Sequence, residues 1–320
     1  MTEKFLLIKA KGGLGNRMLS AISGLIYADL SGRVPVIDWR DGTYSAGGEN
    51  AYPLLFRAPP MPLLSEIEQM TEVTPEIWSG HLSDRASAMV QRNDPDKHAS
   101  ARIYRKYCVD LARIDQPEKL AVFFSYLPKL GRLMRHMRAD AQFRGRSWDD
   151  VMSDYLARWF QPNTRVEEGV TKIMNAIPRP VIGVHVRYTD LKVPLGPIKA
   201  ALRRQLQRHP SASIFLATDN ADVQAEFKAE FANVYHIDKA LLPGGVQLHK
   251  ANHDFDKQIE AENALIDMWA LSRCDHLIYS RNSTFALTAA LIGCLKRTQQ
   301  DDVDRWNLSV VGKRLLQDFL

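Results

Sequence analysis

Short apolar runs alternate with amphipathic stretches along most of this chain. The clearest run is Val181–Val186, which follows Pro178 and Pro180 and in which four of the six residues are valine or isoleucine. A short run that is apolar at nearly every position and rich in β-branched residues predicts a strand buried on both faces of a parallel sheet. Similar runs predict further strands at 5–10, 34–39, 120–124, 214–218, 233–237 and 275–279.

The amphipathic stretches predict helices. After the first run, apolar residues recur at helical spacing from Met18 to Tyr27, and Asn16 is a suitable N-cap for this helix. The stretch from Pro53 to Pro117 has little periodicity, so we expect only short helices and irregular structure there. Further helices are predicted at 148–159, 166–176, 199–207, 222–231, 260–273 and 283–292, followed by a short apolar helix at 310–320.

Strands that alternate with helices through short connections predict an α/β fold, with parallel sheets covered by helices on both faces. A chain of 320 residues is too long for one core, and two domains of roughly 150 residues each are the natural expectation. The pattern becomes more regular near residue 165. The expected division is therefore 1–165, 166–300 and a C-terminal tail helix in 301–320.

The composition narrows the classes of partner. Lys plus Arg (42) exceed Asp plus Glu (37) by five, which favours an anionic ligand or an anionic membrane surface but is too small an excess to indicate nucleic acid. Cys108, Cys274 and Cys294 are far apart, which fits a reducing compartment better than a disulfide framework. No apolar run approaches the roughly 20 residues of a membrane span. We expect a cytoplasmic protein, with peripheral membrane contact and oligomeric state left open.

Polar side chains follow the strand predicted at 181–186. His185, Arg187 and Asp190 emerge at its carboxyl end, where open α/β sheets bind their ligands. The permanently charged, planar guanidinium of Arg187 suits two phosphate oxygens. The alternative is a structural ion pair between Arg187 and a carboxylate such as Asp190.

Two other strand ends carry comparable groups. Asp219 and Asn220 follow the strand at 214–218; Asp219 could accept hydrogen bonds from a guanine or ribose edge, or could cap the next helix. In Arg281-Asn-Ser-Thr284, Asn282 or Ser283 is the predicted N-cap of a helix whose free N–H groups suit a phosphate. Because all three strand ends meet at one edge of a parallel sheet, a nucleotide-diphosphate site is expected there.

A glycine turn follows the first strand. Lys11-Gly-Gly-Leu-Gly-Asn-Arg17 joins a strand to a helix, and its free backbone N–H groups form a corner that can bind an anion. Its spacing is neither that of a dinucleotide fingerprint nor that of a P-loop. The glycines could also serve only to form a tight turn.

A metal site is the rival interpretation. His249 and His253, four residues apart and close to Asp256, resemble a ligand set, and Asp302 with Asp304 forms a DxD pattern. Both lie in predicted loops without a capped strand beside them. A solvated polar loop is the better interpretation of 249–256, and no metal is expected.

The motifs together are similar to those of a known family. KGGLGNRM at 11–18, VIDWR at 36–40, HVRYTD at 185–190, FLATDN at 215–220 and the segment from Ala264 to Ala290 resemble the GDP-fucose-dependent fucosyltransferases, especially the rhizobial nodulation α-1,6 enzymes. Residues 53–165 carry little of the likeness.

The resemblance implies a GT-B-like fold with two Rossmann-type domains facing each other across a cleft, and an inverting transfer without metal or other cofactor. GDP-fucose would be held mainly by the C-terminal domain. Arg187 would hold the β-phosphate and His185 would lie beside the nucleotide. The remaining implied contacts are Asp219 and Asn220 with the base, Ser283, Thr284 and Phe285 at the diphosphate, and Gly13, Gly15 and Asn16 across the cleft.

The catalytic base and the acceptor stay open at this point. The related eukaryotic α-1,6 enzymes have a glutamate shortly after the HxR motif, whereas 191–197 of this chain contains no carboxylate. Asp190 is the first candidate for the base, followed by Asp41 and Glu49. The resemblance suggests the 6-hydroxyl of GlcNAc in an oligosaccharide or glycolipid as acceptor. Another nucleotide-sugar transferase and a catalytically silent GDP- or sugar-binding module remain as alternatives.

Overall fold

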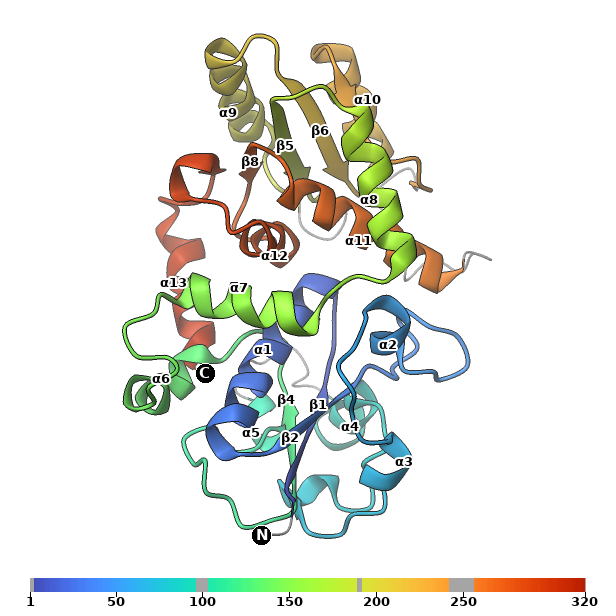
Figure 1. Ribbon diagram of the computed structural model, residues 1–320, viewed down its shortest axis with the longest axis vertical. Helices are drawn as coiled ribbons and strands as arrows, with labels where there is room; N and C mark the ends of the chain where they lie inside the picture. Colours follow the sequence, from blue (N-terminus) through green and yellow to red (C-terminus); the bar gives the residue numbers. More distant parts are fainter. Residues whose placement is uncertain (1–2, 96–102, 189–191, 242–255, 320) are drawn as a thin grey trace. The chain divides into compact units, whose positions relative to one another are not determined.

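Two compact units make up the structure, a computed structural model that describes residues 3–95, 103–188, 192–241 and 256–319 (Figure 1). The first unit is Met1–Gln161 together with Gly312–Leu320, and the second is Pro162–Val311. The segment expected to be a tail helix is thus shared between the units. Its residues up to Val311 belong to the second unit, and the rest belong to the first.

The first unit contains a four-stranded parallel sheet in the order β2-β1-β4-β3. Three of its strands were predicted, because their apolar runs are five residues long. The strand β3 was not predicted, because two residues are too few to show a periodicity. The strands are β1 (Phe5–Lys9), β2 (Val34–Asp38), β3 (Val73–Thr74) and β4 (Leu120–Phe124).

The long helix α1 (Leu14–Ser31) follows β1 directly and is buried over its first fifteen residues. Its N-cap is Gly13, in an extended backbone conformation, and not Asn16 as the sequence suggested; Asn16 lies inside the first turn. The remaining helices of this unit include the short segments expected between Pro53 and Pro117. They are α2 (Ala51–Leu55), α3 (Leu64–Ile67), η1 (Glu76–Trp78), α4 (Ala86–Asn93), α5 (Tyr104–Tyr107), α6 (Leu130–Ala139) and α7 (Trp148–Trp159).

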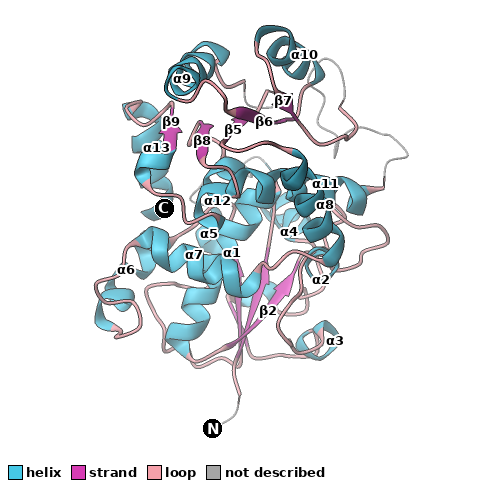
Figure 2. Ribbon diagram, turned by 45° about the horizontal axis from the view of Figure 1, so that its top comes forward, coloured by secondary structure: helices cyan, strands magenta, loops and turns pink. Residues whose placement is uncertain are grey.

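The second unit contains a five-stranded parallel sheet in the order β7-β6-β5-β8-β9, flanked by helices (Figure 2). All six residues of the central strand β5 are buried, as predicted. The edge strand β9 was not predicted, because its sequence Gln-Asp-Asp is wholly polar. The tail helix α13 begins after this strand, at Leu308. The strands are β5 (Val181–Val186), β6 (Ser213–Thr218), β7 (Val234–Tyr235), β8 (His276–Tyr279) and β9 (Gln300–Asp302).

The helices of the second unit divide between the two faces of the sheet. Ile182, Val184 and Val186 share a core with α9 and α10, whereas the alternate residue Gly183 faces α11. The helices are α8 (Thr164–Ala176), α9 (Leu195–Arg208), α10 (Ala221–Glu230), α11 (Lys257–Ser272), α12 (Thr284–Ile292) and η6 (Arg297–Gln299); α13 (Leu308–Phe319) leads into the first unit.

Gly183 allows the end of α11 to approach β5 closely. A Cβ atom at this position would lie 2.9 Å from Sγ of Cys274 and 3.2 Å from Cδ2 of Leu271. We therefore expect Gly183→Ala to lower the free energy of unfolding by about 1–3 kcal/mol in a urea titration. The matched control is Gly196→Ala in α9, where a Cβ would meet nothing within 4 Å. Equal stability of the two variants would contradict this packing.

Candidate functional site

His185 points toward α11 and α12, because it lies two residues after Gly183 on the same face of β5. Its side chain is buried, and its ring stacks on Phe285 of α12 with 5.1 Å between centroids and 21° between planes. Burial first, and then the positive charges of Arg187 and Lys239, lower the pKa of His185 to about 3. The imidazole is therefore neutral at pH 7, with one ring nitrogen donating and the other accepting.

Arg187 is half-buried and lies immediately beyond β5. Its charge is close enough to lower the pKa of His185, and its carbonyl oxygen accepts a hydrogen bond from Val193 N–H at 3.1 Å. This hydrogen bond links the backbone of Val193 to that of Arg187. Asp190, the first candidate for the base, lies outside the described residues, and its role stays a prediction.

Asp219 and Asn220 have separate structural duties at the end of β6. The Asp219 carboxylate accepts a hydrogen bond from Tyr188 N–H at 2.7 Å, which ties the end of β6 to the segment after Arg187. The Asn220 side chain is buried and accepts from Val223 N–H at 2.9 Å as the N-cap of α10. The sequence analysis named Asp219 as a possible cap of the next helix, but Asn220 is the cap. Asp219 instead fixes the backbone just after Arg187.

The start of α12 offers groups for an anion. Of the two predicted candidates, Asn282 and Ser283, it is Ser283 that is the N-cap residue, but its side chain makes no cap hydrogen bond. Its Oγ is buried and has no hydrogen-bond partner among the described residues. The first N–H groups of a helix have no acceptor within the helix, and they attract negative charge. Phosphate oxygens can therefore accept hydrogen bonds here from the Ser283 hydroxyl and from the backbone amides of Thr284 and Phe285.

The loop before α12 is held by the two aspartates of the DxD pattern. The Asp302 carboxylate pairs with the Arg281 guanidinium and accepts from Arg281 N–H at 3.0 Å. Asp304 accepts from the Ser280 hydroxyl, and Ser280 Oγ in turn accepts from Asn282 N–H at 3.2 Å. These carboxylates are used as loop supports, which removes the main reason for the metal interpretation.

The second candidate metal site, at His249 and His253, lies outside the described residues. Within the described ranges, no three or more His, Cys, Asp or Glu side chains are grouped so as to hold a metal ion.

Two residues of this region, Asp267 and Lys239, were not predicted. Asp267 of α11 is buried; its Oδ2 accepts from Lys239, and its Oδ1 has no partner in the described part of the chain. Burial raises the pKa of Asp267, while Lys239 and His236 act to lower it. An aspartate between Ile266 and Met268, at a position that helical spacing assigns to the core, was the available signal in the sequence.

The glycine turn of the first unit is built around Arg17, another residue that was not singled out. Arg17 is fully buried; its Nε donates to the Gly12 carbonyl at 2.7 Å, and its Nη2 pairs with Asp41 at 2.5 Å. Its Nη1 is buried without a partner among the described residues. Gly15 and Asn16 lie in the first turn of α1, and both are buried. Two candidates of the sequence analysis, Gly15 and Asn16, thus belong to a turn that Arg17 stabilises.

The two alternative bases also lie in the first unit. The Asp41 carboxylate is engaged by Arg17 and also accepts from Thr43 N–H at 3.0 Å. Both contacts hold the Asp41 carboxylate within the glycine turn of the first unit. Glu49 is exposed.

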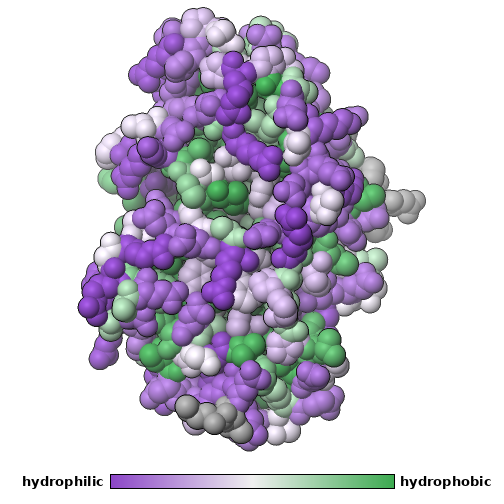
Figure 3. Space-filling view, in the orientation of Figure 1, coloured by the Kyte–Doolittle hydropathy of each residue, from purple (hydrophilic) through white to green (hydrophobic). Residues whose placement is uncertain are grey.

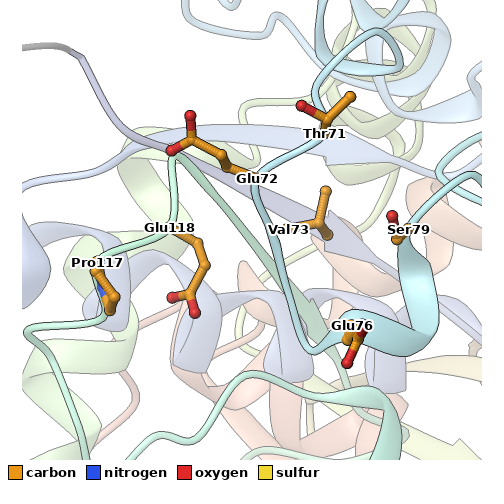
Figure 4. Close-up of a pocket in the computed structure, with 7 residues that line it drawn as sticks. All are labelled: Thr71, Glu72, Val73, Glu76, Ser79, Pro117 and Glu118. Carbon is orange, nitrogen blue, oxygen red and sulfur yellow. The ribbon is translucent and has the colours of Figure 1, made fainter.

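A pocket in the first unit lies at the opposite end of its sheet (Figure 4). It is found at the amino ends of β3 and β4, whereas the glycine turn follows the carboxyl end of β1. Ligands of open α/β sheets bind at carboxyl ends, so this pocket is not part of the candidate site. Its lining residues are Thr71, Glu72, Val73, Glu76, Ser79, Pro117 and Glu118.

Comparison with known proteins assigns the chain to a family. Residues 146–310 match the family model described as Nodulation protein Z (NodZ). The chain belongs to the NodZ family. The family match includes β5, α12 and every strand end of the second unit, and it begins near the end of the first unit.

Two curated relatives extend the likeness along the chain. Nodulation protein Z of Azorhizobium caulinodans is 24% identical over 321 residues, which cover 89% of this chain and 88% of that protein. Probable fucosyltransferase 9 of Arabidopsis thaliana is 25% identical over 298 residues, again 89% of this chain. The chain spans only 59% of the length of the plant protein.

Solved structures share the fold. The NodZ α-1,6-fucosyltransferase soaked with GDP-fucose matches with a TM-score of 0.62 at 20% identity, over 91% of this chain and 93% of that one. POFUT1 in complex with GDP-fucose matches with a TM-score of 0.51 at 10% identity, over 91% and 94%. At these identities the likeness establishes the fold alone. It confirms the predicted α/β, GT-B-like architecture.

The pKa of His185 makes stability depend on pH. Between its ordinary value of 6.5 and about 3, the unfolded chain binds a proton at this histidine and the folded chain does not. The contribution of neutral His185 to the free energy of unfolding is therefore fully present well above pH 6.5, and it is lost as the pH falls toward 3. Between pH 7.5 and 5.5 we expect His185→Gln to lose about 1.4 kcal/mol less unfolding free energy than the unmodified chain. Urea titrations at both pH values measure this difference, and identical losses would show that His185 is not buried as a neutral ring.

Proposed function

We propose that this protein is a glycosyltransferase that moves L-fucose from GDP-fucose to a sugar hydroxyl. Membership of the NodZ family supports the proposal, as do the relatives named as fucosyltransferases and the solved neighbours that contain GDP-fucose or GDP. The observation that carries it is the group of side chains at the carboxyl edge of the second sheet. A neutral His185, a half-buried Arg187 and the Ser283 hydroxyl at a helix start meet the needs of a nucleotide diphosphate.

The base subsite is built from Asp267 and His185. A buried carboxylate oxygen without a donor is unfavourable, so Asp267 Oδ1 favours a ligand that brings N–H groups. The guanine edge has adjacent N1–H and N2–H donors for one carboxylate, whereas adenine presents an acceptor at N1. The neutral imidazole of His185 can donate to guanine O6. We therefore assign base recognition to Asp267 and His185, and leave Asp219 and Asn220 as supports of the site.

The diphosphate subsite is formed by Arg187 and the first turn of α12. When the bond between fucose C1 and the phosphate oxygen breaks, negative charge develops on the β-phosphate. The Arg187 guanidinium, the Ser283 hydroxyl and the amides of Thr284 and Phe285 stabilise that charge without a metal ion. A preorganised donor of this kind lowers the barrier by about 3 kcal/mol.

The transfer proceeds with inversion, by attack of the acceptor hydroxyl on the face of C1 opposite the diphosphate. The hydroxyl needs an acceptor for its proton. Asp190 is the proposed base, because it follows Arg187 by three residues, while Asp41 is engaged by Arg17 and is a weaker candidate. The proposed acceptor is the 6-hydroxyl of GlcNAc in an oligosaccharide; the description of the solved relative as an α-1,6-fucosyltransferase supports the 6-linkage.

The test uses Arg187→Ala and Arg187→Lys with GDP-fucose and GlcNAc oligosaccharides. We expect kcat/KM for transfer to fall by about a hundredfold or more in Arg187→Ala, and Arg187→Lys to recover part of it, because the lysine restores the charge without the fork of donors. Arg203→Ala on the exposed face of α9 is the matched control and should leave transfer unchanged. EDTA should have no effect on any of these rates.

Transfer by Arg187→Ala at the rate of the unmodified chain would contradict the assignment of the diphosphate subsite. GDP binding without any release or transfer of fucose would instead identify a silent GDP-binding module. Activity with a donor that carries another nucleotide or sugar would identify a different glycosyltransferase.

A further inference from the structure

Helix α13 presents its apolar stripe to solvent. At 100° per residue, Leu315, Leu316 and Phe319 fall within a stripe about 100° wide on one face of the helix. Their exposed fractions are 58%, 64% and 48%. An amphipathic helix of a globular protein normally buries such a stripe, and a contiguous exposed one marks an interaction surface.

The last turns of α13 are fixed on the first unit. The ring of Phe319 lies where a Cβ on Gly131 of α6 would be only 2.8 Å from it. Arg105 of α5 donates to the Phe319 carbonyl at 3.0 Å. Burial raises the pKa of Asp318 to about 6, and nearby Lys129 acts to lower it. The helix is therefore anchored beside α6 (Figure 1), while Leu315 and Leu316 remain open to solvent.

The segment that carries α6 is strongly basic. Between residues 129 and 146 there are six lysines and arginines and one acidic residue, Asp140, so this segment accounts for the whole net charge of +5. Arg135 and Arg138 of α6 are exposed, and neither forms an ion pair within the described ranges. On the face drawn in Figure 3, hydrophilic residues cover α6 and α7. Lys129 is buried, and Arg132 and Arg146 pair with Asp110 and Asp154, so Arg135 and Arg138 supply the cationic surface beside the exposed leucines.

We propose that the stripe of α13 and the arginines of α6 form a docking surface for an anionic lipid bilayer. A helix that lies in the membrane interface buries its apolar face in the acyl boundary and keeps basic side chains at the head groups. Each basic side chain near an anionic surface strengthens binding by about fivefold.

The surface suits attachment to one side of the bilayer. The helix has 12 residues, or about 18 Å of length, which is too short for a hydrocarbon core of about 30 Å. None of the described helices is long and apolar enough to cross a membrane. A second copy of the chain fits the surface less well, because a symmetric contact would bring two sets of α6 arginines together.

Sedimentation of the full chain with vesicles tests the proposal. We expect the protein to bind vesicles of phosphatidylcholine with about one third phosphatidylserine, and to bind pure phosphatidylcholine at least about tenfold more weakly. Raising the salt from about 0.1 M to about 1 M should weaken binding to the anionic vesicles, because the charges are screened.

Two double variants separate the two components of the surface. Leu315→Glu with Leu316→Glu should lower vesicle binding by about tenfold or more. Arg135→Glu with Arg138→Glu should remove the preference for phosphatidylserine. Leu63→Glu, at a leucine 65% exposed in the first unit, and Arg113→Glu, at an arginine side chain 60% exposed, are matched controls that should bind normally. GDP affinity in solution should be the same in all variants.

Absence of binding to the anionic vesicles would overturn the proposal, as would equal binding by the Leu315 and Leu316 double variant. A dimer in solution that is lost in that variant, together with no vesicle binding, would show that a second copy covers α13 instead.

Discussion

Burial of polar groups at the carboxyl edge of the second sheet is the constraint on which the rest of the structure depends. Ser283 Oγ is buried there and Asp267 Oδ1 is buried in α11, both without partners among the described residues, and His185 is held neutral. An unsatisfied buried polar atom costs about 1–3 kcal/mol, and few such atoms occur in folded proteins. Polar groups without protein partners can pair with a ligand, and the proposed nucleotide site rests on this property of Ser283 and Asp267.

The side chains around this edge act as supports. Asp302 and Asp304, on and just after the edge strand β9, hold the loop from which α12 starts. Asp219 fixes the backbone of Tyr188 just after Arg187. Each of these carboxylates could have been a catalytic or metal-binding group by sequence alone. Their hydrogen bonds hold the Arg187 segment and the loop before α12 in place.

The elements that were predicted well have a strong local signal. The strand β5 is apolar at almost every position, and Ser283 stands where a helix would need a cap, so both could be located from the sequence. Asn16 was misplaced because Gly13 adopts an extended backbone that begins α1 earlier. The polar strand β9 owes its place to pairing with β8, and such tertiary contacts leave no periodicity to detect.

The functional residues divide in the same way. His185 lies in the last two residues of β5 and Arg187 follows the strand directly, so their position at a sheet edge was predictable. Asp267 lies inside a helix and Lys239 in a loop, and only the folded chain brings them together. The sequence predicted a short apolar helix at 310–320, but the exposure of Leu315 and Leu316 depends on how α13 packs against α6 and could not be read from the sequence.

The most direct measurement is titration calorimetry of GDP and ADP against the unmodified chain and Asp267→Asn. If the buried carboxylate recognises guanine, the unmodified chain prefers GDP, and the variant binds GDP at least about tenfold more weakly while its ADP affinity is unchanged. Equal GDP affinity in the two proteins would contradict a nucleotide site at this edge of the sheet.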